Sequence, residues 1–248
     1  MKTAVLIFGM LRQFADTAKD WKFDEYLDCD YYISTWDKSS QKINNHGGEV
    51  PSNYRTFDVT EDYIKSVIPN IACDLLKEKE IFTSNCSTQA KMFFHWKNVF
   101  NLMQSSKKEY DLILLVRPDI RIQIHSFGAS SHDPLDTPIL NWKYDEDTLY
   151  CDDLMKIRKT DPIAFPAEEF HYLSNDLLFC GSPKIMTKFI DSIPDMSKDE
   201  FKYYPWTPHV DLGRILKSSN LYPNDLHPFF ASYPTRPPNH WQINPLDL

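Results

Sequence analysis

The sequence predicts an α/β protein built around one mostly parallel sheet. Two apolar runs, residues 3–8 and 111–116, are almost free of polar residues, as expected of strands covered on both faces. Such runs alternate with segments of helical periodicity through the first half of the chain, which is the pattern of parallel strands joined by helices. With 248 residues the chain can bury such a core without disulfides or a structural metal. We therefore expect one domain over residues 1–248.

The first third of the chain is expected to continue with a second strand and two helices. Residues 13–27 are predicted to be helical, and residues 31–35 to form the second strand. Residues 38–58 are polar and rich in Asn, Gly, Ser and Pro, which indicates a long loop. Residues 61–68 have the pattern of a short helix that Pro69 ends.

The longest predicted helix covers residues 85–107. Its apolar residues recur at three- and four-residue spacing, and Asn85, Ser87 and Thr88 are candidate N-caps. The strand at 111–116 follows this helix. After it, residues 121–124 alternate in polarity as an edge strand would.

The second half of the chain is expected to be less regular. Residues 133–176 carry 11 acidic and 4 basic residues, which indicates an acidic, loop-rich insertion. A strand at 177–180 then leads into a helix that Ser182 caps and Pro183 begins. The last helix is expected to begin with a similar Thr-Pro pair, and residues 229–233 to form a strand.

Composition excludes several function classes. The chain has only six glycine residues, and none of their spacings makes a glycine-rich phosphate loop of the dinucleotide-binding or P-loop kind. The GxSxG motif of many hydrolases is also missing. A net charge of −8 gives no global positive field for nucleic acid or anionic lipid, although a local basic groove is compatible with it.

Cysteine usage and hydropathy point to the cytoplasm. The five cysteine residues are odd in number, widely spaced and free of CxxC pairs, which favours free thiols in a reducing compartment over disulfides or a zinc site. The apolar run at residues 4–11 is followed at once by Arg12, Gln13 and Asp16, so we interpret it as a buried strand and not as a signal peptide. No apolar run approaches the ~18 residues of a membrane span.

The candidate ligand-binding residues follow the predicted strands, because ligands of such sheets bind at the carboxyl ends of the strands. Four strand ends contribute, and together they supply two arginine and two aspartate side chains. The residues are Gly9 and Arg12 after the first strand, Thr35, Trp36 and Asp37 at the second, Arg117 and Asp119 at the third, and Gly181 and Ser182 at the last. This mixture suits an anionic ligand that also carries hydroxyl groups, such as a sugar nucleotide.

Arg12 and Asp119 have the most specific chemistry among these candidates. The planar guanidinium of Arg12 matches phosphate oxygens, although it could equally form a surface ion pair. Asp119 could hold a divalent cation, with Mn²⁺ or Mg²⁺ as the candidate cofactor, or hydrogen-bond a sugar hydroxyl. It could also simply pair with Arg117 or Arg121.

Candidate acid–base residues lie later in the chain. His209 and Asp211 fall in the first turn of the last predicted helix, where either could take a proton from an acceptor hydroxyl. His209 could equally be a packed histidine, and Asp211 could serve the helix dipole or an ion pair. Asn175 and Asp176 could bind sugar hydroxyls or cap a loop.

Two tryptophans and two DxD triplets are further candidates for the same site. Trp36 and Trp206 are the tryptophans expected near a cleft. The two DxD triplets, Asp28-Cys29-Asp30 and Asp145-Glu146-Asp147, are interpreted as solvated charge, because the first precedes its strand and the second lies in the acidic insertion.

Five segments in this order resemble a family of small glycosyltransferases found in bacterial polysaccharide loci and in large viruses and phages. They are VLIFGMLRQF, DYYISTWD, a long helix with Gln89 and Trp96, YDLILLVRPDI and NDLLFCGSPKIMTKF. The resemblance implies a GT-A-like, Rossmann-like domain, with residues 1–125 as the nucleotide-binding half and 126–248 as the acceptor-side half. It also implies a nucleotide-sugar donor and an acceptor that is a glycan, a lipid-linked sugar or a protein. If the protein is viral, its cytoplasm is that of the host cell.

The same resemblance implies roles for individual residues. Gly9 and Arg12 would line the donor phosphates, and Thr35, Trp36 and Asp37 would lie near the nucleoside. Arg117 and Asp119 would stand where other GT-A enzymes carry a metal-binding DxD. Asp176, Gly181 and Ser182 would border the transferred sugar or the acceptor, with Asn175 and Trp206 on the acceptor side. Two departures are that one Asp replaces the DxD, and that Pro208-His209 stands where relatives carry Pro-Glu.

Three other functions remain open at this stage. A phage-type enzyme that glycosylates a hydroxymethylated DNA base would need a basic rim, for which Lys91, Lys97, Lys107 and Lys108 are candidates. A non-catalytic carbohydrate- or nucleotide-binding module would bind without turnover. A metal-dependent phosphohydrolase would need several carboxylates clustered at strand ends, where the sequence offers only Asp37 and Asp119.

Overall fold

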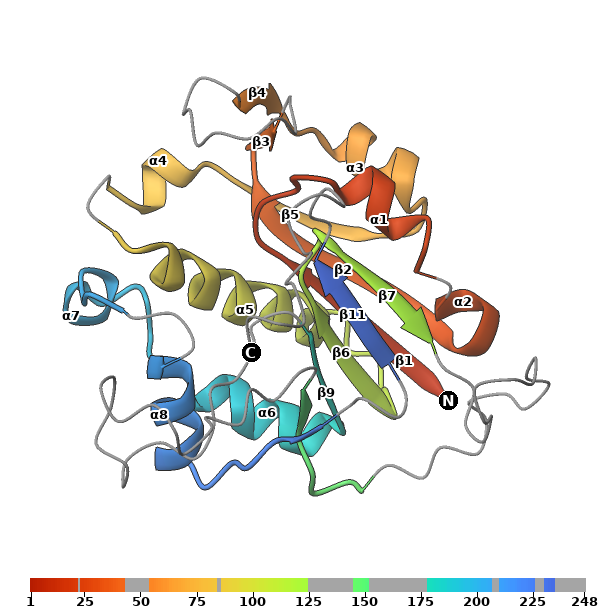
Figure 1. Ribbon diagram of the computed structural model, residues 1–248, viewed down its shortest axis with the longest axis vertical. Helices are drawn as coiled ribbons and strands as arrows, with labels where there is room; N and C mark the ends of the chain where they lie inside the picture. Colours follow the sequence, from red (N-terminus) through yellow and green to blue (C-terminus); the bar gives the residue numbers. More distant parts are fainter. Residues whose placement is uncertain are drawn as a thin grey trace, which may run out of the picture.

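The computed structural model describes eight stretches of the chain: residues 1–21, 23–42, 54–83, 86–124, 145–151, 178–206, 210–225 and 230–234. Their centre is a seven-stranded sheet (Figure 1). Across the sheet the strands are β10 (Asn224–Asp225), β8 (Tyr150–Cys151), β9 (Leu178–Gly181), β6 (Leu112–Val116), β1 (Lys2–Phe8), β2 (Asp28–Trp36) and β5 (Ala72–Leu76). Helices cover it on both sides, so the protein is of the α/β class.

The sheet is mostly parallel, as predicted. β1 pairs in parallel with β2 and β6, β2 with β5, and β10 with β8. The exception is β9, which runs antiparallel to both β6 and β8. The chain passes from β1 to β2 and β5 on one side, and then returns to β6 on the other side of β1. The order of strands therefore reverses at β1, and an open α/β sheet forms its ligand crevice at such a reversal.

Two apolar layers enclose the sheet, because alternate strand residues point to opposite faces. Ala4, Leu6 and Phe8 of β1 pack under α5 (Thr88–Ser105), α6 (Pro183–Ser192) and α8 (Val210–Ser218). Val5 and Ile7 of the same strand pack on the other face, against α1 (Phe14–Ala18), α2 (Phe23–Tyr26) and α3 (Glu61–Val67). This explains why the strand is apolar without interruption.

Helix α5 confirms the longest predicted helix. The Ser87 hydroxyl accepts a hydrogen bond from the Ala90 backbone N–H at 3.1 Å, so Ser87 is the N-cap among the three candidates. The buried face carries Phe93, Trp96 and Phe100, which pack onto the sheet. Similarly, Ser182 caps α6 by accepting from the Ile185 N–H, and Pro183 begins the helix as predicted.

Two expectations about the first half of the chain were wrong, and two elements there were not predicted. The helix predicted at 13–27 is two short helices, α1 and α2, because Trp21 between them turns inward and donates its indole N–H to the Ile120 carbonyl. Residues 38–58 are not all loop: β3 (Lys38–Lys42) and β4 (Tyr54–Asp58) form an antiparallel pair. The edge strand β5 and the short helix α4 (Glu78–Ile81) had no predicted counterpart.

The remaining described elements complete the second half. β7 (Ile120–Ile124) pairs antiparallel with β11 (Phe230–Pro234), which confirms two predicted strands and joins them in a separate two-stranded sheet (Figure 1). The helix α7 (Asp199–Lys202) precedes α8. Of the predicted acidic insertion at 133–176, only residues 145–151 are described. Among the described residues, no helix has both the length and the apolar character needed to cross a membrane.

Candidate functional site

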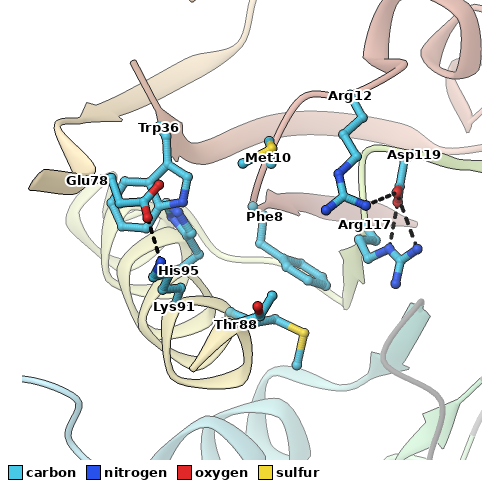
Figure 2. A pocket seen from close by; sticks show the side chains of 12 residues that line it. Phe8, Met10, Arg12, Trp36, Glu78, Thr88, Lys91, His95, Arg117 and Asp119 are labelled. Atoms are coloured by element: carbon cyan, nitrogen blue, oxygen red, sulfur yellow. Dashed lines mark hydrogen bonds and ion pairs between the residues drawn. The ribbon is translucent and has the colours of Figure 1, made fainter. Parts of the chain in front are cut away.

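A pocket opens at the carboxyl ends of β1, β2 and β6, at the point where the strand order reverses (Figure 2). Its volume is about 230 Å³. The strand ends contribute Phe8, Gly9, Met10, Arg12, Trp36, Arg117 and Asp119, and α4 and α5 contribute Glu78, Thr88, Lys91, Met92 and His95. The sequence therefore predicted the strand-end half of this pocket and missed the helical half.

One end of the pocket is cationic. Arg117 donates from Nε to Asp119 Oδ1 at 2.6 Å and from Nη2 to Oδ2 at 3.3 Å, which is a two-point contact. Arg12 approaches the same carboxylate, with Nη1 4.0 Å from Oδ2. The side chain of Asp119 is 15% exposed, whereas those of Arg117 and Arg12 are 29% and 53% exposed. Two guanidinium groups therefore meet around one carboxylate, and we call this the cationic end of the pocket.

The conformation of Gly9 brings Arg12 to this end. Gly9 has a φ of +93°, in the left-handed region that favours glycine, and its N–H donates to the Ser34 carbonyl at 3.0 Å. The chain therefore turns sharply at the end of β1. Arg12 follows this turn, and its N–H closes a second tight turn on the Met10 carbonyl at 2.9 Å.

The opposite end of the pocket is lined by rings. Trp36 is buried at the end of β2, where it stacks on Phe94 and meets the His95 ring at a centroid distance of 4.1 Å. His95 is buried as well, and its Nδ1 lies 2.8 Å from the Ser34 hydroxyl. Burial lowers the pKa of His95 to about 3, so its ring is neutral at physiological pH.

An ion pair marks the rim beside these rings. Lys91 of α5 donates to Glu78 of α4 at 2.6 Å, and both side chains are partly exposed (Figure 2). Figure 2 also shows that this pair and His95 lie across the pocket from Arg12, Arg117 and Asp119. The pocket thus has a cationic end, a buried aromatic end and a polar rim.

The structure does not bring Thr35 and Asp37 to the pocket. Thr35 is buried on the face of β2 opposite Ser34 and Trp36. The backbone of Asp37, just after β2, has a structural role. Its N–H donates to the carbonyl of Leu76 at the end of β5, and its carbonyl accepts from the Val59 N–H.

The expected place of Gly181 and Ser182 at the carboxyl edge of the sheet was wrong. β9 runs antiparallel to β6, so Gly181 pairs with Ile113 near the start of β6, and Val116 at the end of β6 pairs with Leu178. Gly181 therefore lies about 10 Å along the strand from the pocket edge. The Ser182 hydroxyl has a structural role, since it caps α6 and donates to the Glu146 carbonyl at 2.6 Å.

Gly181 has a packing role, which gives a first prediction. A Cβ at this position would collide with the Ile185 side chain of α6 and lie 3.4 Å from the Thr148 carbonyl oxygen. We expect Gly181→Ala to lower the free energy of unfolding by about 1–3 kcal/mol, measured by urea denaturation, because α6 must shift away from β9. Ligand affinity at the pocket should be unchanged at temperatures where the variant is folded; a loss of affinity would return Gly181 to the binding site.

The other predicted residues lie away from the pocket or outside the described residues. Asp211 is buried at the start of α8 and pairs with Arg214 at 3.0 Å. The Trp206 indole N–H donates to the Phe201 carbonyl, and its ring packs edge-on against Phe93. Predictions for three residues fall outside the described residues: Asn175, Asp176 and His209.

Both DxD triplets form local contacts. Asp30 accepts from Lys108 at 2.7 Å and from the Tyr110 hydroxyl at 2.9 Å, at the amino end of β2. Asp145 accepts from the Asp147 N–H within its own turn, and Asp147 pairs with Lys184 at 2.6 Å.

The described residues do not fit a divalent-cation site at Asp119. Both of its oxygens accept hydrogen bonds from Arg117, and the Arg12 guanidinium lies beside them. Within the described ranges, no three His, Cys, Asp or Glu side chains come together as metal ligands would.

The buried histidine gives a prediction about pH. An unfolded histidine binds a proton near pH 6.5, whereas burial holds the pKa of His95 at about 3 in the folded state. Between these values only the unfolded chain carries the extra proton, so folding stability falls as pH falls. We expect the free energy of unfolding to drop by about 1.4 kcal/mol more per pH unit below 6.5 in the wild type than in His95→Gln, measured by urea denaturation. Parallel pH profiles for the two proteins would contradict this.

Comparison with known proteins finds similarity to solved structures but not to protein sequences. No protein-family model matches the chain, and no curated protein sequence matches it. Among solved structures, the chain is similar to a galactosyltransferase, LgtC, in complex with donor and acceptor sugar analogs. The two are 11% identical with a TM-score of 0.46, and the match covers 86% of this chain and 70% of the other. A likeness of this extent does not establish a shared activity.

Proposed function

We propose that this chain is a glycosyltransferase that uses a nucleotide-sugar donor, in a single GT-A-like domain whose amino-terminal half binds the nucleotide. The observation that supports this is the pair of arginines, Arg12 and Arg117, held on Asp119 at the strand-order reversal beside a ring-lined pocket. The chain has no glycine-rich phosphate loop, so a diphosphate would be neutralised by side chains, backbone amides or a metal, and we propose that the arginine side chains do this. In this proposal, Arg12 and Arg117 bind that diphosphate.

The arginines would act on the leaving group. When the bond from the sugar to the diphosphate breaks, negative charge grows on the departing phosphate oxygen. Guanidinium N–H groups fixed before the reaction stabilise this charge without reorganising. Asp119 would hold Arg117 in its orientation, which is a positioning role.

The reaction also needs a group that takes the proton from the acceptor hydroxyl. His209 and Asp176 remain our candidates for it. For Asp211 we propose instead a role in fixing the start of α8, because it is buried and paired with Arg214.

The acceptor is proposed to be a hydroxyl of a glycan, a lipid-linked sugar or a protein, in the cytoplasm of a bacterium or of a virus-infected cell. The cytoplasm is supported by five cysteines, none of which forms a disulfide bond. A modified DNA base is less well supported. Lys91 pairs with Glu78 at the pocket, whereas Lys107 and Lys108 lie beyond the other end of α5, about 24 Å along the helix axis. These lysines do not form one basic rim.

The experiment that tests the proposal is a binding panel by calorimetry. It uses UDP, GDP, dTDP, CMP and their sugar conjugates, each with Mg²⁺, with Mn²⁺ and with EDTA. We expect at least one nucleotide to bind, to lose affinity in Arg12→Ala, and to keep most of it in EDTA because the arginines meet its charge. A panel without binding would overturn the proposal.

A binding module without turnover is the second candidate. It is favoured by one observation: both carboxylates among the described pocket residues, Glu78 and Asp119, are in ion pairs. The two functions differ in one readout. A transferase releases the nucleoside diphosphate from its sugar conjugate when an acceptor sugar mixture is added, whereas a binding module leaves the conjugate intact.

A further inference from the structure

Ser34 fixes the proton on the His95 ring. Both residues are fully buried, and the Ser34 hydroxyl lies 2.8 Å from His95 Nδ1. Within the described part of the chain, this nitrogen is the acceptor that the hydroxyl hydrogen can reach. A buried hydroxyl donates its hydrogen where an acceptor is present, so Nδ1 accepts and the ring proton resides on Nε2.

The Nε2–H group of His95 is then a buried donor. No hydrogen-bond acceptor for Nε2 is found among the described residues, and the nearest aromatic neighbour is the Trp36 ring. Buried polar groups in native proteins are nearly always paired, so this donor calls for an explanation. The Nε2 atom has almost no exposed surface in this structure, so a ligand that accepts from it must displace part of the side chains that cover it. His95 belongs to the wall of the pocket that also holds Arg12 and Arg117.

The surroundings of this donor suit a flat, largely apolar group. The buried lining residues at this end are Phe8, Trp36 and His95, whereas the charged residues Lys91 and Glu78 stand at the partly exposed rim. A hexose would bring several hydroxyl groups, each of which needs its own partner at depth. A heterocyclic base needs stacking surfaces and one or two hydrogen bonds at its edge.

On the premise of the proposed function, we infer that His95 is a specificity residue that donates Nε2–H to a carbonyl oxygen on the distal edge of the donor's base. With the diphosphate at Arg12 and Arg117, the edge of the base farthest from the phosphates enters deepest. That edge carries O4 in uracil and thymine and O6 in guanine, which are acceptors. Cytosine and adenine carry an amino group there, which would set a second donor against Nε2–H.

The test uses two pairs of ligands that differ at this edge: UDP with CDP, and GDP with ADP. Affinities are measured by calorimetry at pH 7.5 on the full-length wild-type protein. We expect the pair that binds to prefer its oxo member by about 10-fold or more. His95→Phe should bring the two members of that pair to within about 2-fold, while leaving binding of inorganic pyrophosphate unchanged. Ser34→Ala should reduce the preference, because the ring is no longer held with its proton on Nε2.

A measurement on the wild type alone covers the case in which these buried variants fail to fold. The ¹⁵N and ¹H signals of the His95 Nε2–H group should shift when UDP or GDP is added, and should not shift with inorganic pyrophosphate. An unchanged signal would overturn the inference and assign this proton to the face of Trp36. Equal affinity within the pair that binds, or a preference that survives in folded His95→Phe, would also overturn it while the proposed function stands. Failure of these four nucleoside diphosphates, and also of dTDP and CMP, to bind would overturn both.

Discussion

Replacing Arg117 by alanine is expected to weaken nucleoside diphosphate binding by about 100-fold, because a charge-assisted hydrogen bond to a phosphate oxygen is worth about 1.5–3 kcal/mol. Arg117 is the more buried of the two arginines and makes the two-point contact with Asp119. Without it, the Asp119 carboxylate would lose this two-point contact and would repel the phosphates. The pocket would then have one positive charge fewer with which to attract an anion. Calorimetry with UDP and GDP measures the change.

Three matched variants show whether charge or geometry is responsible. Arg117→Lys keeps the charge and loses the planar fork, so we expect an intermediate affinity. Adding Asp119→Ala to Arg117→Ala should recover part of the loss, because the carboxylate no longer repels the phosphates. Lys65→Ala removes an equally positive but remote side chain, which pairs with Glu61 on the surface of α3, and should change nothing. If Arg117→Ala and Lys65→Ala behave alike, the cationic end of the pocket does not bind the diphosphate.

The main strands and helices could be predicted because burial on both faces leaves an unambiguous sequence pattern. β1 and β6 are apolar without interruption, and α5 repeats its apolar residues with the helical period. β5 escaped prediction because it is a half-buried edge strand of five residues. β3 is polar along its length, and only its pairing with β4 makes it a strand.

The sequence does not show in which direction a strand runs, and this limited the prediction of the candidate site. A four-residue buried run such as β9 has the same sequence pattern whether it runs parallel or antiparallel to its neighbour. The assumption that it was parallel put Gly181 and Ser182 at the wrong edge of the sheet. Arg12, Arg117 and Asp119 escaped this error because β1 and β6 are parallel neighbours, so both ends meet at one edge.

The helical half of the pocket was missed for a different reason. The apolar repeat of α5 predicts a core helix, which it is. Such a repeat does not show which residues of the helix line a pocket. A signal was nevertheless present: His95 stands beside Trp96 on the buried side of a helix, where a polar ring needs a partner. Its partner, Ser34, is 61 residues away on β2, and no local pattern connects the two.

The largest loss of stability is expected for Trp96→Ala. Trp96 is fully buried, and its ring lies 5.3–5.5 Å from the rings of Phe8, Phe93, Phe179 and Phe189. It therefore joins α5 to β1, β9 and α6 at one point. Truncating a buried tryptophan costs about 3–5 kcal/mol, which is a large part of the 5–15 kcal/mol that typically stabilises a folded protein. Guanidinium denaturation measures the change in free energy of unfolding.

Trp96→Phe separates packing from hydrogen bonding at this position. The indole Nε1 of Trp96 is buried and has no hydrogen-bond partner among the described residues. Phenylalanine keeps a ring among the four neighbours and removes this unpaired donor, so part of the cavity cost is offset. We expect Trp96→Phe to lose less than half as much stability as Trp96→Ala. Equal losses would mean that the indole nitrogen is paired in solution, because removing it would then cost a hydrogen bond as well as volume.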